Sequence, residues 1–183
     1  DLQQPSWTIW TGQAIWETSL DKTLNQENTV NKKISGDVLL AYNDSGDVVA
    51  QMTKGPIEIF YCHAITSTEH TNDRPQWLLR SVDTETTYNR WGQPPTQFIW
   101  FQIPKWLDQI QRLVHASTST NKPINTVENV YVHAGFEWTV EYREDVLVIR
   151  QVEKNEKISL FLDSSLSSIA PVFSPAFASI PSS

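Results

Sequence analysis

The stretch that decides the fold is FIWFQIPKWL, residues 98–107. Pro104 suits the first turn of a helix, because proline fixes the backbone angle there and the missing N–H is not needed. Beyond it the apolar residues follow one another at steps of one, three and four, which is typical of a helix with one buried face. They are Trp106, Leu107, Ile110, Leu113 and Val114. We therefore predict a helical insertion covering about residues 94–115.

The chain before this stretch alternates between apolar and polar residues, as strands do. Residues 7–18 predict a long first strand with Gly12 at a bend or bulge, and the polar residues 19–33 predict a loop. Residues 37–42 and 47–53 predict a hairpin, because the linking Asn-Asp-Ser-Gly is typical of a tight turn.

A turn at residues 54–56 leads into a predicted strand at 57–65, where alternation assigns side chains to two faces. One face takes Ile57, Ile59, Tyr61, His63 and Ile65, and the other takes Glu58, Phe60, Cys62 and Ala64.

The chain after the insertion predicts a closing antiparallel meander. Its strands are residues 127–134, 136–142, 146–152 and 158–162. With residues 77–82 the expected total is about nine, and residues 84–91 are a further candidate strand. The fold class is therefore mainly β, an antiparallel curved sheet or unclosed β-barrel with the helical insertion packed on or in it. A β-sandwich is the alternative.

The domain organisation follows from composition. Residues 1–163 form a single β-barrel-like domain, and residues 164–183 resemble a Ser/Pro/Ala-rich C-terminal tail. Val172, Phe173 and Phe177 are the tail residues able to dock elsewhere.

Charge and length limit the possible partners. The formal net charge is −7 and the basic residues form no run, which argues against nucleic acid and against docking on an anionic membrane. No apolar stretch approaches the ~20 residues that span a bilayer. Residue 1 is Asp and the only methionine is Met52, so we expect a processed or trimmed chain, with removal of a signal peptide favoured over deliberate trimming.

The residues do not form a catalytic constellation. Cys62 and His63 are neighbours on a predicted strand, so their side chains point to opposite faces, and a buried cysteine is usually a small apolar filler. The four histidines lack metal-ligand spacing. We therefore expect no enzyme activity, no metal and no cofactor, and keep as a weak alternative a hydrolase that uses His63 or Glu58.

The concentration of aromatic residues in 98–107 suggests a cavity beneath the helix, because one face of a helix cannot bury so many large side chains. A curved sheet of this size has room for one apolar ligand. The predicted ligand-binding residues are Trp10, Trp16, Met52, Ile59, Trp100, Ile103 and Trp106. A filled core is equally compatible with the pattern, and would make the protein an interaction module whose exposed aromatic residues and tail meet a partner.

The order of these features resembles the bacterial lipoprotein-sorting carriers and receptors of the Lol type. The resemblance lies in the long first strand, the hairpin at 37–53, Lys54-Gly55-Pro56-Ile57-Glu58-Ile59, Trp100-Phe101-Gln102-Ile103-Pro104 and residues 138–162. It implies a monomeric, unclosed β-barrel that accepts lipid or lipoprotein acyl chains in the periplasm or at the outer membrane, with an envelope protein as a possible partner. The chain departs from the LolB-like receptors at position 1, where Asp stands in place of the lipidated cysteine, and its loop tip offers only Ile57.

Overall fold

The computed structural model describes residues 5–20, 30–66, 74–82, 87–118, 126–153 and 155–173, together with Phe177 and Ile180. Ten strands form one antiparallel sheet in the order β6-β5-β4-β3-β2-β1-β10-β9-β8-β7, and a short β11 pairs with β1. The first six are β1 (Ser6–Leu20), β2 (Val30–Asn43), β3 (Val48–Lys54), β4 (Ile57–Ile65), β5 (Gln76–Ser81) and β6 (Thr87–Trp91). The others are β7 (Thr126–His133), β8 (Phe136–Arg143), β9 (Val146–Gln151), β10 (Glu156–Leu162) and β11 (Val172–Phe173).

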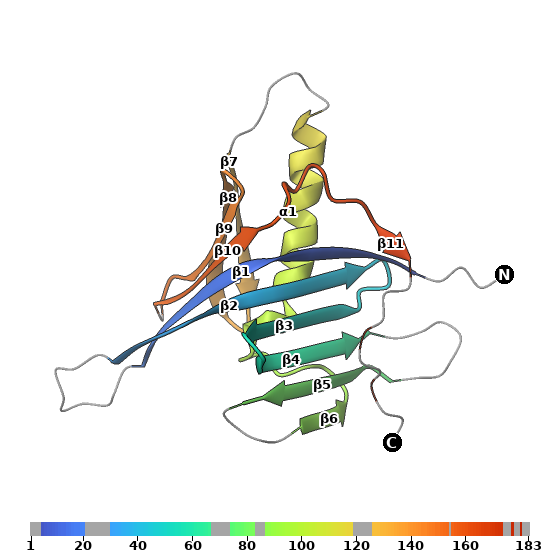
Figure 1. Cartoon of the computed structure of the whole chain (residues 1–183), viewed down its shortest axis with the longest axis vertical. Coiled ribbons are helices and arrows are strands. Elements are labelled where there is room, and N and C mark those ends of the chain that lie inside the picture. The colour runs from blue at the N-terminus through green and yellow to red at the C-terminus, as the bar shows by residue number, and fades with distance from the viewer. Residues whose placement is uncertain are drawn as a thin grey trace.

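The sheet curves around a single helix, α1 (Ile103–Thr118), which follows a short 3₁₀ turn, η1 (Ile99–Phe101) (Figure 1). The helix contacts β2 and β3 on one side and β7 on the other. Among the described strands no pairing joins the two edges, β6 and β7, so the sheet stays open. The predicted fold class, a curved, unclosed antiparallel sheet with one packed helix, is confirmed.

The predicted hairpin between β2 and β3 is present. The amide of Gly46 donates a hydrogen bond to the carbonyl of Asn43 at 3.0 Å, and Gly46 has a φ of +87°, which favours glycine. The Asn43 side chain also accepts a hydrogen bond from the amide of Asp47 at 2.9 Å. The turn residues read from the sequence therefore act as expected.

The loop predicted at residues 19–33 is shorter than expected. β1 extends to Leu20 and β2 begins at Val30, and the two strands pair over their full length. Residues 21–29 lie outside the described part of the chain. As a result β1 and β2 form an arm that continues beyond β3, whose last partner on β2 is Asp37, while β10 pairs with β1 as far as Glu17.

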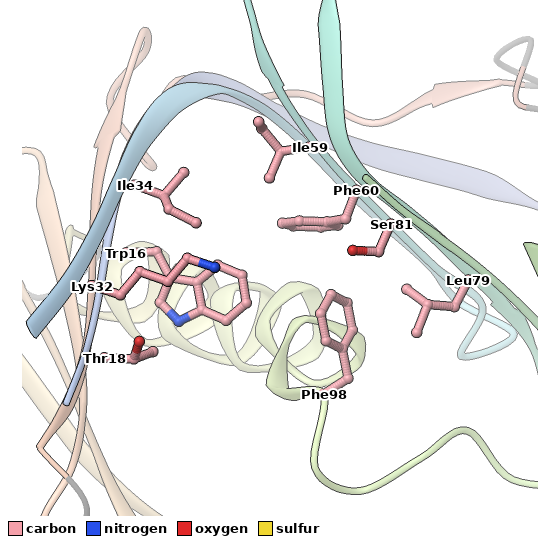
Figure 2. Close-up of a pocket in the computed structure, with 9 residues that line it drawn as sticks. All are labelled: Trp16, Thr18, Lys32, Ile34, Ile59, Phe60, Leu79, Ser81 and Phe98. Atoms are coloured by element: carbon pink, nitrogen blue, oxygen red, sulfur yellow. The ribbon is translucent and has the colours of Figure 1, made fainter. Parts of the chain in front are cut away.

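The face assignment in β4 is wrong at its first residues. The register with β3 shifts after Met52, which pairs with Phe60, while the next residue, Thr53, pairs with Glu58. Ile59 is thus the extra residue of a β-bulge, which breaks the alternation of side chains. Ile59 and Phe60 consequently both point to the concave side (Figure 2).

Several of the described residues after Asp163 contact the sheet, within the stretch predicted to be a C-terminal tail. Leu166 is fully buried, and its amide donates a hydrogen bond to the hydroxyl of Tyr142 at 3.4 Å. Further on, Val172 pairs with Trp7, and Phe177 contacts the Trp7 ring at a centroid distance of 4.8 Å. Val172 and Phe177 are among the tail residues that the sequence marked as able to dock elsewhere.

Leu166→Ala is therefore expected to lower the free energy of unfolding by about 2–5 kcal/mol, the cost of removing a buried leucine side chain. Urea denaturation measures it. Leu113→Ala is the matched control, because Leu113 is 45% exposed on α1 and should change stability by less than about 1 kcal/mol. Equal effects of the two substitutions would mean that the segment is not part of the cooperative core.

Candidate functional site

A pocket of about 310 Å³ opens where the β1-β2 arm separates from β4. The arm continues past the hairpin of β3 and β4, in which Lys54 pairs with Ile57, and the pocket lies between the arm and residues 59–60 of β4 and 79–81 of β5. Phe98, just before η1, forms a further wall of this pocket (Figure 2). The lining residues are Trp16, Thr18, Lys32, Ile34, Ile59, Phe60, Leu79, Ser81 and Phe98.

Three aromatic rings in mutual contact form the apolar wall of the pocket. Trp16 lies 6.1 Å from both Phe60 and Phe98, and Phe60 lies 5.2 Å from Phe98, all edge to face. Edge-to-face packing stabilises such rings beyond the area they bury and limits their rotation. The wall is therefore formed in advance of any ligand.

A hydrogen bond outside the pocket fixes the orientation of Trp16. Its Nε1 donates to Oε1 of Glu156 on β10 at 2.9 Å. The one polar atom of the indole is therefore paired with Glu156, which is not among the residues that line this pocket.

Polar atoms occupy limited parts of the lining. Thr18 and Lys32 are direct partners in the β1-β2 register, next to the apolar pair of Trp16 and Ile34. Ser81 contributes a hydroxyl from β5, beside Leu79. Among the described residues that line the pocket, Lys32 is the charged one.

Of the seven residues predicted to bind ligand, the structure places Trp16 and Ile59 in this pocket. The remaining five are 0–4% exposed members of the filled core, namely Trp10, Met52, Trp100, Ile103 and Trp106. None of these five lines this pocket, the pocket at Gln13 and Gly36 or the pocket at Thr96 and Gln97.

The expectation of a cavity beneath the helix is wrong because the curved sheet covers the aromatic stretch from two sides. Trp100 packs against Trp16 and Phe60 in one half of the sheet. Trp106 stacks on Tyr131 of β7 in the other half, with centroids 5.0 Å apart. Of the large apolar residues in this stretch, Phe98 alone is half-buried, and it lines the observed pocket.

Several lining residues escaped prediction. Lys32 lay in an expected loop, and Phe60 was assigned away from Ile59 because alternation cannot anticipate a bulge. Leu79 and Ser81 had a usable signal, since alternation along β5 places them on one face.

The groups considered for catalysis lie apart from one another. Cys62 is fully buried in the concave core, and burial raises the pKa of its thiol, which keeps it in the neutral form. His63 is on the opposite face of β4, in contact with the rings of Trp7 and Tyr61. This confirms that the two side chains do not meet.

Glu58 lies roughly 16 Å from His63 along the strand. Its carboxylate accepts hydrogen bonds from Arg80 at 3.0 Å and Gln51 at 3.0 Å. Burial acts to raise the pKa of Glu58, but these hydrogen bonds outweigh it and the pKa is lowered. Glu58 and His63 therefore do not pair with each other.

Two searches concern other kinds of site. Within the described ranges, no three His, Cys, Asp or Glu side chains are grouped so that they could hold a metal ion. Over the same residues, no helix has both the length and the apolar character needed to cross a membrane.

Comparison with protein-family models gives no match, and comparison with curated proteins gives no significant match either. The resemblance to Lol-type carriers therefore stays a prediction.

Proposed function

We propose that the protein binds the apolar chain of a lipid, or of a lipoprotein acyl group, in the pocket between the β1-β2 arm and β4-β5. The observation that carries the proposal is a pocket of about 310 Å³ with aromatic and aliphatic walls, at the lower end of the range for small-molecule sites. A binding role without catalysis accords with the burial of Cys62 and the separation of Glu58 from His63.

The energetics of such a ligand are favourable. Each buried CH₂ contributes about 0.8 kcal/mol, so burying about eight of them contributes roughly 6 kcal/mol before the cost of ordering the chain. The preformed wall of Trp16, Phe60 and Phe98 lowers the part of that cost that would arise from ordering protein side chains. The proposed place of action is the cell envelope, and it rests on the resemblance to Lol-type carriers.

Filling the pocket tests the proposal. Ile59→Trp adds bulk to a lining residue and is expected to weaken binding of dodecanoate by about tenfold or more, because displacing two or more CH₂ groups costs over 1.4 kcal/mol. Isothermal titration calorimetry below the concentration of micelle formation measures it.

Ile57→Trp is the matched control on the same strand, because Ile57 is 54% exposed and does not line the pocket. It should leave the affinity unchanged. If dodecanoate gives no binding heat with the original protein, or if both substitutions weaken binding equally, the pocket is not the site.

One observation favours a protein-interaction module as the second candidate. Tyr88 and Trp91 are 36% and 47% exposed on β6, an edge strand of the sheet. Exposed aromatic residues and open strand edges are features of protein interfaces. The same titration separates the two candidates, because this one predicts no chain binding that depends on Ile59.

A further inference from the structure

The pocket has a polar end on the β1-β2 arm. Trp16 pairs with Ile34, and two residues further out Thr18 pairs with Lys32. Side chains two apart on a strand share a face, so the lining changes from apolar to polar along the arm. Figure 2 shows the Lys32 side chain extending beside the Trp16 ring toward the pocket.

The charged residue that lines this end is basic, in a chain that is acidic as a whole. The chain carries 21 acidic and 14 basic residues, and Lys32 is the charged residue among the described residues that line the pocket. Glu17 alternates with Trp16 and Thr18, so it points to the other face of β1. Glu156 accepts the Trp16 hydrogen bond and lines a separate pocket with His133 and Gln151.

We infer that the pocket selects single-chain amphiphiles with an anionic head group, such as a carboxylate or a phosphate, and that Lys32 is the residue that sets this preference. The inference rests on the proposed function. The apolar chain would contact Trp16, Ile34 and Phe60, while the head stays at the rim beside the Lys32 ammonium and the Thr18 hydroxyl. An ammonium forms a charge-assisted hydrogen bond with such a head, and its alkyl stem packs along the chain. A head group kept at the rim stays in contact with water and so avoids the cost of full burial.

Calorimetric titrations with four ligands of equal chain length test the inference: dodecanoate, dodecyl phosphate, dodecanol and dodecylamine. Lys32→Met removes the charge and keeps an unbranched side chain. It should lower the affinity for dodecanoate and dodecyl phosphate by about three- to fivefold, the range expected for loss of a partly exposed ion pair. The affinity for dodecanol should change by less than about twofold. Lys33→Met is the control, because it removes the same charge from the opposite face of β2.

The outcomes separate this inference from the proposed function. If dodecanoate and dodecanol both bind and Lys32→Met changes neither, head-group selection is refuted while chain binding stands. The same holds if dodecylamine binds most tightly, or if Lys33→Met has the effect of Lys32→Met. If none of the four ligands binds, the proposed function fails as well. If Lys32→Met weakens binding of only one of the two anions, the site is assigned to the source of that anion, fatty acid for dodecanoate or phosphate-headed lipid for dodecyl phosphate.

Discussion

Gly12→Ala is expected to lower the free energy of unfolding by more than about 3 kcal/mol. A Cβ atom at this position would overlap the carbonyl oxygen of Phe161 and lie 2.9 Å from the Cα of Leu162. Both atoms belong to the backbone of β10, so no side chain can rotate away. Relief requires β1 and β10 to separate at the junction between the two halves of the sheet.

Gly55→Ala is the comparison that isolates this mechanism. Gly55 has a φ of +58°, where alanine is disfavoured by about 1–2 kcal/mol, but no atom lies within 4 Å of its added Cβ. Chemical denaturation should therefore show a clearly larger loss for Gly12→Ala. A loss at Gly12 no greater than that at Gly55 would contradict the close approach of β10.

The role of Gly12 illustrates what a single sequence conveys about this fold. A glycine within an alternating run indicated a special backbone position, and a bend or bulge was the expected cause. The register of β1 with β2 is unbroken from Trp7 to Leu20, so the bulge is absent, and the reason for glycine is the backbone of β10. That strand begins more than 140 residues later, and local patterns carry no signal for it.

Local chemistry predicted those elements whose causes are local. The Asn43–Gly46 turn, the strand after Pro56 and the helix after Pro104 are each specified by residues within a few positions, and each is present. The bulge at Ile59 depends on how β3 and β4 pair, and the pocket depends on where β3 ends relative to β2. Both follow from register, which alternation alone does not determine.

The sequence predicted only part of the candidate site, because strand register and sheet curvature determine which residues line it. Trp16 and Ile59 were recognised as large apolar residues on concave faces, and both line the pocket. Trp100 and Trp106 met the same criterion but lie where the curved sheet closes over them. Hydrophobicity identifies the residues that are removed from water, whereas the curvature of the sheet determines which of them line a pocket.

Trp100→Ala is expected to lower the free energy of unfolding by about 3–5 kcal/mol, because it removes a fully buried ring and leaves a large cavity. The ring contacts Phe60 at 4.8 Å and Trp16 at 5.7 Å, both of which line the pocket. Thermal or urea unfolding measures the loss. Trp91→Ala is the matched control, because Trp91 is 47% exposed and its removal should cost less than about 1 kcal/mol.

A second substitution shows which property of Trp100 matters. The Nε1 of Trp100 is buried and has no hydrogen-bond partner among the described residues, so the indole contributes packing and no polar contact. Trp100→Phe keeps an aromatic ring and removes that unpaired donor, whose burial is itself unfavourable. It should therefore recover most of the stability lost in Trp100→Ala. A Phe variant as unstable as the Ala variant would mean that the indole nitrogen does form a hydrogen bond in the folded protein. The core would then depend on a polar contact at Trp100, where packing of the ring against Phe60 and Trp16 is otherwise sufficient.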